Sequence, residues 1–332
     1  MEVCEQTWRR GTRSLRPLLE RIGVDARGCS RRLQRALVDF GADEAFAAAA
    51  AKVREHYGVE VNAERVRRVC LTHAGKLAER ACTQPRTTLA ARGPDWIVAE
   101  ADGCMLPIVD TTGAPPGADR RKHRTVSWRE TRVVAARVLG ETKTHYDATL
   151  GEVAEAGCRW SQTVGAAGWA VHTRIHVVGD GAPWLAQQAR ERFGRHGIYL
   201  LDLYHVCDYL SAVWPEDKAT VHAHRDALKA GLIDEVLLAL RNRLEPPTCP
   251  EQQAPARRAL RYLENRLDQL DYPAAIAAGL PVGSGLIESA HRHLLQARLK
   301  LAGAWWVEHN AHNMTQLRVC RANGQWDNYW RN

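Results

Sequence analysis

A short hydrophobic run that ends on an acid constrains this chain more than any other feature of its sequence. Val177 and Val178 lead through Gly179 to Asp180, and Gly181 then opens a stretch with the composition of a helix. A carboxylate at the end of a buried strand is well suited to hold a divalent metal, because the strand fixes the side chain and the glycine leaves space for a ligand. The run therefore predicts a strand, a turn and a helix, with an acid at the turn.

Strands and helices are expected to alternate around this run. The local patterns predict the order β-β-β-α-β-α-β, which makes the fold class α/β. The expected strands are residues 96–102, 132–139, 145–150, 175–178 and 198–201, and the expected helices are residues 151–169 and 183–195. In such a sheet the first and fourth strands can lie side by side.

Residues 1–90 are predicted to be helical and to bind DNA. Two helices are expected at residues 31–40 and 43–57, and after Gly58 a third begins at the cap Asn62 and runs to residue 80. A helix, a short glycine turn and a basic helix outline a helix-turn-helix. A helical hairpin with a solvated basic face accounts for the same pattern equally well. The expected DNA-binding residues here are Arg65, Arg67, Arg68 and Lys76.

The second half of the chain is expected to be mostly helical. Residues 84–94 form a predicted linker, residues 204–278 a helical subdomain inserted after the last strand, and a final amphipathic helix runs from about Leu286 to Leu301. The expected parts of the chain are residues 1–90, 95–203, 204–280 and 281–332.

Three acids stand at informative places in this order of elements. Asp102 ends the first expected strand, Asp180 ends the fourth, and Glu288 lies in the first turn of the final helix. The two strand-end carboxylates are expected to converge, and a helix packed across the sheet supplies the third. Three carboxylates can hold two Mg²⁺ ions, one that activates a water or a 3′-hydroxyl and one that stabilises the leaving oxygen of a phosphodiester.

Each acid also has a simpler interpretation. Asp102 and Asp180 precede Gly103 and Gly181, where aspartate is a common turn former. Glu288 is a favourable charge in the first turn of a helix. On these positions alone, structural roles and a metal site both stay open.

A set of motifs around the acids adds a family resemblance. The motifs are residues 179–184 (GDGAPW), 201–205 (LDLYH), 283–289 (GSGLIES), 298–300 (RLK) with Trp305 and Trp306, and 323–330 (NGQWDNYW). In this order they closely resemble the DDE transposases of bacterial insertion sequences of the ISKra type, and more distantly the Mutator-like transposases. The resemblance covers roughly residues 39–330.

The resemblance implies an RNase H-like catalytic core, a mixed sheet with flanking helices, interrupted by an all-helical insertion. Asp102, Asp180 and Glu288 become the catalytic triad, which binds Mg²⁺ or Mn²⁺ as two ions. Residues 202–205 resemble the D-x-x-H element of Mutator-like enzymes, so that Asp202 supports the site and His205 orders DNA or the scissile phosphate. A core histidine bonded to a backbone carbonyl is the alternative for His205.

Further side chains are expected to position DNA. Arg292, His293, Arg298 and Lys300 are placed to contact phosphates beside the metals, with a solvated basic face as the alternative. Trp305 and Trp306 can stack on an unpaired base, although packing is favoured for at least one of them. A basic run that includes Arg120, Arg121 and Lys122 either binds DNA or forms a mobile surface loop.

Composition sets the expected surroundings of the protein. A net charge of +8 and a pI near 9.1 favour a polyanionic partner. The nine cysteines form no C-x-x-C pair, and no apolar stretch is long enough to cross a membrane. We therefore expect a bacterial cytoplasmic, nucleoid-associated protein without membrane contact.

The predicted activity is a transposase that cuts DNA at the terminal inverted repeats of an insertion sequence and joins the 3′-hydroxyls to target DNA. Pairing two ends calls for a homodimer or a larger assembly. A nuclease without strand joining and a non-catalytic DNA-binding regulator are the alternatives. The chain begins later than transposases of this type and alters the stretch at residues 301–306, so a truncated or non-mobile copy is also expected.

Overall fold

The structure is a computed structural model that describes residues 7–10, 13–21, 24, 28–82 and 89–331. The chain divides into two compact units. The first comprises residues 1–84, 107–127 and 294–332, and the second comprises residues 85–106 and 128–293. Each unit has its own set of helices, and the second contains most of the sheet.

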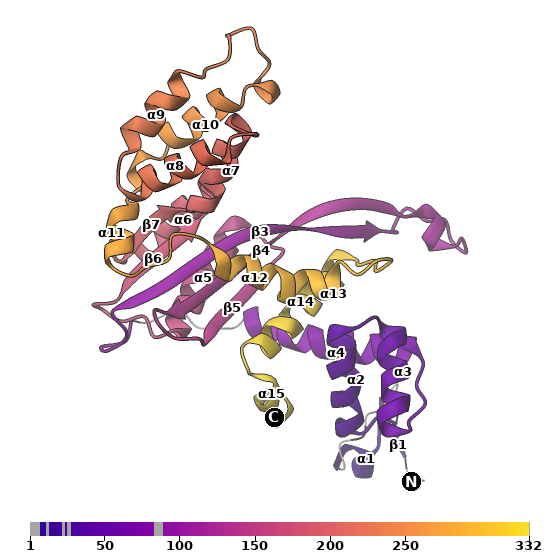
Figure 1. The fold of residues 1–332 in the computed structure, drawn as a ribbon. Helices are drawn as coiled ribbons and strands as arrows, with labels where there is room; N and C mark the ends of the chain where they lie inside the picture. Colours follow the sequence, from indigo (N-terminus) through magenta and orange to yellow (C-terminus); the bar gives the residue numbers. More distant parts are fainter. Residues whose placement is uncertain (1–6, 11–12, 22–23, 25–27, 83–88, 332) are drawn as a thin grey trace. The chain divides into compact units, whose positions relative to one another are not determined.

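A mixed five-stranded sheet has the order β5-β4-β3-β6-β7 (Figure 1). Its strands are β3 (Trp96–Asp110), β4 (Thr125–Val138), β5 (Thr144–Thr149), β6 (Arg174–Gly179) and β7 (Gly197–Leu201). β3 pairs with β6 and β6 with β7 in parallel, whereas β4 and β5 are antiparallel. The expected strands are all present, and the prediction that the first and fourth lie side by side is confirmed.

β3 and β4 are longer than expected. Both strands continue past the rest of the sheet, and the 3₁₀ turn η1 (Arg120–His123) lies between them (Figure 1). The N–H of Leu139 donates to the carbonyl of Trp96 at 3.1 Å, which places the end of β4 beside the start of β3. Two strands paired this way satisfy each other's backbone hydrogen-bonding groups, so their outer halves do not need a buried apolar face. Their sequence there consequently lacks the alternation of apolar and polar residues that predicts a strand.

Two helices cover one face of the sheet. α5 (Val153–Ala166) and α6 (Pro183–Phe193) agree with the expected helices apart from their ends. Ile97, Ala99 and Ala101 project from β3 into this apolar layer, together with buried side chains of both helices. Successive strand residues alternate between faces, so Val98, Glu100 and Asp102 point to the opposite side of β3.

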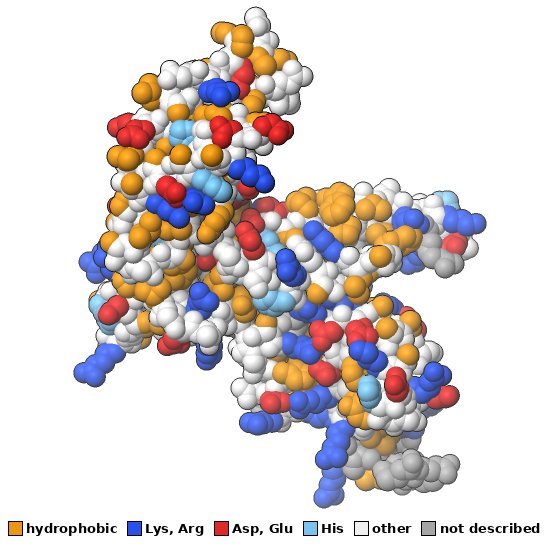
Figure 2. All heavy atoms as spheres, viewed as in Figure 1, with side chains coloured by type: hydrophobic (Ala, Val, Ile, Leu, Met, Phe, Trp, Pro, Cys, Tyr) orange, Lys and Arg blue, Asp and Glu red, His pale blue; other side chains and the backbone are white. Residues whose placement is uncertain are grey.

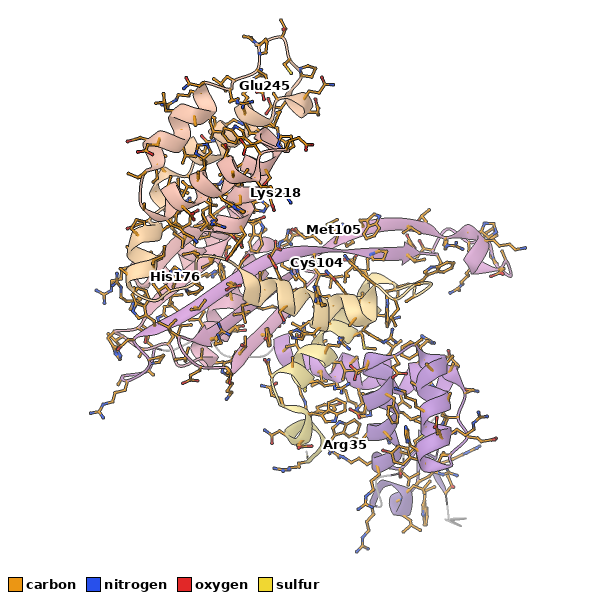
Figure 3. All side chains as sticks on the ribbon, in the orientation of Figure 1. Arg35, Cys104, Met105, His176, Lys218 and Glu245 are labelled. Atoms are coloured by element: carbon orange, nitrogen blue, oxygen red, sulfur yellow. The ribbon has the colours of Figure 1, made fainter. Side chains whose placement is uncertain are left out.

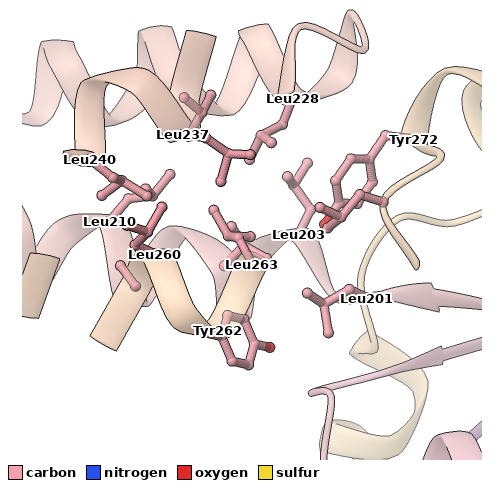
Figure 4. Close-up of a cluster of buried hydrophobic side chains, with 14 of the residues drawn as sticks. Leu201, Leu203, Leu210, Leu228, Leu237, Leu240, Leu260, Tyr262, Leu263 and Tyr272 are labelled. Atoms are coloured by element: carbon pink, nitrogen blue, oxygen red, sulfur yellow. The ribbon is translucent and has the colours of Figure 1, made fainter. Parts of the chain in front are cut away.

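The region of the expected helical subdomain contains α7 (Leu203–Val213), α8 (Lys218–Lys229), α9 (Ile233–Arg241), α10 (Pro255–Glu264) and α11 (Tyr272–Ala277). The 3₁₀ turns η3 (Glu251–Gln253) and η4 (Leu267–Gln269) connect them. Their inward leucines form one core that includes Leu210, Leu237 and Leu263 and reaches Leu201 at the end of β7 (Figure 4). The subdomain is thus fastened to the strand ends by shared apolar burial.

The expected final helix is divided into three pieces. It begins as α12 (Gly285–Ala290), widens into a π-helical turn at His291–Gln296, and ends as α13 (Ala297–Leu299). A π turn inserts one residue into the helical ladder and changes the direction of the side chains that follow. The amphipathic pattern predicted the helix but not this change of winding.

The first unit contains α1 (Pro17–Arg21), α2 (Arg31–Asp43), α3 (Phe46–Tyr57), α4 (Ala63–Cys82), α14 (Glu308–Ala322) and α15 (Trp326–Arg331). α4 packs against α2, α3 and α14. Gly58 ends α3 with φ +64°, and the side chain of Asn62 accepts from the N–H of Arg65 at 2.8 Å, so the expected turn and cap are confirmed.

A helical assignment for all of residues 1–90 is wrong at one place. β1 (Trp8–Arg10) and β2 (Arg13–Leu15) form an antiparallel pair in which Trp8 lies opposite Leu15. Strands of three residues are too short for their sequence to show the alternation of apolar and polar residues that predicts a strand. They are held by backbone hydrogen bonds to each other.

Two observations bear on the surroundings of the chain. Every cysteine for which the structure describes the side chain is free of disulfides. None of the described helices combines the length with the apolar composition that crossing a bilayer requires.

Candidate active site

The pairing register explains why the acids meet. β3 and β6 pair with an offset of 78 positions (174 less 96), which equals the separation of Asp102 and Asp180 (180 less 102). β6 and β7 pair with an offset of 22 (197 less 175), which equals the separation of Asp180 and Asp202 (202 less 180). Residues in register on parallel strands are immediate neighbours. The pairing ends at the pairs Glu100–Val178 and Gly179–Leu201, and the same offsets carried past these pairs place the three aspartates in one row at that end of the sheet.

Asp102 does not end its strand, which corrects the expectation. β3 continues to Asp110, and only its pairing with β6 stops, at the pair of Glu100 and Val178. Gly103 is also not a turn residue, because it lies inside β3, where a Cβ would come within 2.1 Å of a carboxylate oxygen of Glu130. The turn-former interpretation of Asp102 is wrong. Cys104 and Met105 show the strand running on beyond it (Figure 3).

The carboxylate of Asp102 is held on two sides. Its Oδ1 accepts from the N–H of Gly103 at 2.6 Å, and its Oδ2 lies 3.7 Å from Nδ1 of His291. His291 is buried and begins the π-helical turn, three residues after Glu288. Residues three apart share one face of a helix, so that spacing in the sequence signals a histidine beside the third acid. Sequence reasoning missed it.

Acidic neighbours raise the affinity of Asp102 for a proton. Burial is the largest cause of a pKa for Asp102 that is raised to about 6. The negative charges of Asp180, Glu130 and Glu288 add to the rise, in that order. Asp180 and Glu288 are therefore near enough to Asp102 for their charges to act on it. Within the described chain, none of its three acids forms an ion pair with a lysine or arginine.

The turn that carries Asp180 is clamped by its neighbours. Asp180 caps its own turn through the N–H of Ala182 at 2.8 Å, and its carbonyl accepts from the hydroxyl of Tyr262 at 2.5 Å. Arg266 donates twice to the carbonyl of Gly181, at 3.0 and 2.7 Å. Gly181 has φ +81°, and a Cβ would lie 2.6 Å from Arg266, so glycine is needed here. The helical subdomain thereby fixes the position of the second acid.

The segment before Glu288 is tied to β6 and β7. His176 of β6, labelled in Figure 3, bonds the carbonyl of Pro281 at 2.7 Å. The N–H of Leu203 donates to the carbonyl of Val282 at 2.9 Å. These bonds bring the start of α12 to the end of the sheet where the aspartates lie.

Asp202, just after β7, also bonds the segment before Glu288. Its Oδ1 caps α7 through the N–H groups of Tyr204 at 2.7 Å and His205 at 3.3 Å. Its Oδ2 accepts from the N–H of Ser284 at 2.8 Å and from the hydroxyl of the same residue. All of these partners are internal and Asp202 is buried, which agrees with a supporting rather than a reacting group.

Glu100 is a buried acid that sequence reasoning did not select. Its carboxylate accepts from the N–H of Ile287 in α12 at 2.9 Å, although 187 positions separate the two residues. Burial raises the pKa of Glu100 to about 8, while the bond from Ile287 opposes that rise. Glu100 precedes Asp102 by two residues on one strand, and this spacing is the signal that places both on one face.

His205 lies beside the Asp180 turn. Its ring is half-buried and meets Tyr209 and Tyr262 edge-on, with centroids 5.6 and 6.0 Å apart. Tyr262 in turn donates to the carbonyl of Asp180. The ring of His205 thus contacts the residue that holds the second acid.

Two of the expected DNA-positioning residues are structural. Arg298 is 2 % exposed, donates to the carbonyl of Gly41 at 3.0 Å, and lies over the rings of Phe46 and Trp306. A buried guanidinium cannot reach a phosphate, so that role for Arg298 is wrong. Trp306 is also buried and packs, whereas Trp305 is 48 % exposed and stacks with Arg124 at 3.6 Å.

The remaining expected cations lie on different parts of the surface. Arg292 and Lys300 are exposed, and His293 is half-buried against Tyr146. In the η1 turn, Arg120 and Lys122 are exposed and contribute to the basic tip visible in Figure 2; the Arg121 side chain lies outside the described atoms.

The α4 cations are less uniformly solvated than expected. Lys76 and Arg67 are exposed, and Arg67 pairs with Glu64 at 2.7 Å. Arg65 is half-buried, with its Nε 3.1 Å from the sulfur of Cys29, and Arg68 is half-buried as well. Arg67 and Lys76 are therefore the members of this set most open to a phosphate.

The donor set suits a hard divalent cation. Asp102, Asp180 and Glu288 offer only carboxylate oxygens, which Mg²⁺ and Mn²⁺ prefer. A cation there would also relieve the repulsion that raises the pKa of Asp102. In the part of the chain that the structure describes, however, no three acid, histidine or cysteine side chains are gathered tightly enough to enclose a metal.

Comparison with known proteins gives a partial likeness. No protein-family profile matches the sequence. A Streptococcus gallolyticus protein described as "UPF0236 protein in vanSb 3'region" is 29% identical over 157 residues, which is 46% of this chain and 34% of that protein. The matched part thus spans about a third of the length of that relative.

Proposed function

We propose that this protein is a DDE-type transposase of the ISKra type, with an RNase H-like core that carries the acids. The observation that supports the proposal best is the shared register of Asp102 and Asp180 on parallel strands. Glu288 supports it further, because its charge acts on Asp102 from a helix bonded to the same end of the sheet. The adjacency of the first and fourth strands is that expected for such a core.

The chain's residues have distinct parts in the proposed reaction. Asp102 and Asp180 would hold the metal ions between two neighbouring strands, and Glu288 would complete their coordination from α12. Bound Mg²⁺ or Mn²⁺ would activate the attacking oxygen and stabilise the leaving oxygen. Tyr262 and Arg266 keep the turn of Asp180 in place during the reaction.

Cleavage and joining then use the same site. In cleavage, a water oxygen bonds to the phosphorus, the bond to the 3′-oxygen breaks, and that oxygen takes up a proton. In joining, the freed 3′-hydroxyl attacks a phosphodiester of the target, loses its proton, and displaces the target's own 3′-oxygen. Each step exchanges one P–O bond for another, so no covalent protein–DNA intermediate and no energy source are needed.

The direct test uses labelled DNA that carries the terminal inverted repeats, a target plasmid and Mg²⁺ or Mn²⁺. Products in which the labelled strand is joined to the plasmid support transposase activity. Metal-dependent cutting without joined products favours a nuclease. A protein that binds the ends without metal and never cuts them is a regulator, and the catalytic proposal fails.

DNA binding has support that is independent of the acids. α3 ends at Gly58, α4 begins after Asn62, and Arg67 and Lys76 are exposed on α4. We assign this pair of helices to a helix-turn-helix that recognises the element ends. If it does, replacing Lys76 by glutamine weakens binding and reduces the slope of log affinity against log salt by about 1.

A further inference from the structure

Glu100 is a buried acid outside the proposed triad of Asp102, Asp180 and Glu288. Glu100 lies in β3 and is 2 % exposed. On its face of β3 the preceding residue is the buried Val98, and the buried Ile287 of α12 lies beside it. Burying a carboxyl group is costly unless hydrogen bonds compensate for the lost water. The buried carboxyl group of Glu100 therefore needs a hydrogen-bond partner, which an apolar side chain at this position would not need.

That partner is the start of α12. The first amides of a helix have no partner inside it and are normally capped by the side chain at the N-cap. In α12 the N-cap is Ser284, whose side chain makes no capping bond and instead donates its hydroxyl to Asp202. The N–H of Ile287 instead donates to Glu100 at 2.9 Å, and the N–H of Leu286 interacts with the same carboxylate.

We propose that Glu100 is a positioning residue that sets the distance between the first and third acids. Its side chain leaves β3 on the same face as Asp102, two residues earlier, and it receives the amide directly before Glu288. One carboxylate thus links the strand that carries Asp102 to the helical turn that carries Glu288. The inference rests on the proposed function, because it concerns the geometry of the proposed metal site.

Two substitutions separate this role from simple core packing. Glu100→Gln keeps an oxygen that accepts from Ile287, whereas Glu100→Leu keeps the volume and removes the acceptor. The matched control is Ile97→Val, which trims a fully buried side chain on the opposite face of β3. All three variants are compared as full-length chains with the unaltered protein.

Amide hydrogen exchange reports the contact itself. In Glu100→Leu we expect the amide of Ile287 to exchange about tenfold faster or more, because the first turn of α12 opens locally. In Glu100→Gln and Ile97→Val that amide stays protected. Unchanged protection of Ile287 in Glu100→Leu would show that Glu100 does not anchor the helix.

The affinity for Mn²⁺, measured by electron paramagnetic resonance without DNA, reports the consequence at the site. We expect Glu100→Leu to bind Mn²⁺ about tenfold more weakly, and to cut DNA about 100-fold more slowly. Glu100→Gln should restore both, and Ile97→Val should alter neither.

The possible failures can be told apart. If the unaltered chain neither binds Mn²⁺ nor cuts DNA, the proposed function fails and the positioning role fails with it. If the unaltered chain does both, and Glu100→Leu loses thermal stability but keeps its Mn²⁺ affinity and cutting rate, only the positioning role is overturned.

Discussion

Two groups of acids in the second unit differ in what surrounds them. Asp147 of β5 and Glu155 of α5 share one cation, because Arg159 donates to each of them at 2.9 Å. Asp102 instead feels the negative charge of Asp180, and no lysine or arginine of the described chain pairs with either. The same residue types thus occur once with an internal counter-ion and once without.

The difference is the one expected between an internal ion pair and the proposed metal site. Arg159 is 5% exposed, so its charge can be buried only because two carboxylates balance it. No such cation pairs with Asp102 or Asp180 in the described chain, and burial, followed by the charges of the neighbouring acids, raises the pKa of Asp102. Burial raises the pKa of Asp147 as well, but there the charge of Arg159 opposes the rise. Repulsion of this kind is disfavoured in a folded protein unless a ligand supplies the opposite charge. We infer that the second group is built for a cation.

The largest expected effect tests the unbalanced group. Asp180→Ala should slow metal-dependent cutting of end DNA by about 1,000-fold, or about 4 kcal/mol, because one of the shared metal ligands is lost. Without metal, the free energy of unfolding should fall by no more than about 1 kcal/mol, because the cap on the N–H of Ala182 is lost. As a control, Glu216→Ala removes an exposed acid between α7 and α8 and should cut normally. Unaltered cutting by Asp180→Ala would show that the row is not catalytic.

The group formed by Arg159, Asp147 and Glu155 should affect stability rather than cutting. Arg159→Leu leaves Asp147 and Glu155 without their cation and should lower the free energy of unfolding by about 3 kcal/mol. Urea unfolding monitored by circular dichroism measures this loss. At temperatures where the variant is folded, its cutting rate and its dependence on Mg²⁺ should match those of the unaltered chain. A shift in metal dependence would mean that the two groups are coupled.

How much of this the sequence could predict depends on the range of the interactions. The strands around Asp180 were predicted because buried runs bounded by turns are local patterns, and the convergence with Asp102 followed from their order. The alignment of Asp202 with Asp180 could not be predicted, because it depends on the register in which β6 and β7 pair. Glu100 depends on a bond to Ile287, 187 positions away, which no local pattern reveals.

Errors in the prediction have a similar cause. Arg298 carries the same charge as its exposed neighbour Lys300, but it packs between Phe46 and Trp306 and bonds Gly41. Gly41 and Phe46 lie in α2 and α3, more than two hundred residues earlier in the chain. A basic stretch in the sequence thus shows which charges are present, and tertiary packing decides which of them face the solvent.

A smaller effect is expected for the acid that supports the row. Asp202→Ala removes the cap of α7 and both bonds to Ser284, and should lower the free energy of unfolding by about 2 kcal/mol. Cutting should slow by about tenfold, because α12 is less firmly held. A double-mutant cycle with Ser284→Ala measures the coupling. Strictly additive losses would contradict the link between Asp202 and the segment that carries Glu288.

The smallest effect concerns the dependence of stability on pH. Asp102 has a folded pKa of about 6 against an ordinary value of 3.8, so the folded chain binds this proton more tightly than the unfolded chain does. The destabilisation is therefore fully present above about pH 6 and disappears as the pH falls from 6 towards 3.8. A shift of about two units corresponds to about 3 kcal/mol. The side chain is 38% exposed, and screening by solvent reduces the expected value to about 1 kcal/mol.

Asp102→Asn isolates this contribution. At pH 7.5 without metal the variant should be about 1 kcal/mol more stable than the unaltered chain, and the difference should vanish near pH 4. Unfolding curves across this range measure it. With saturating Mg²⁺ at pH 7.5 the order should reverse, because only the unaltered chain gains stability from binding the ion tightly. A variant that is less stable at every pH and in both conditions would show that Asp102 is balanced within the fold, as Asp147 is, and would remove the contrast between the two groups.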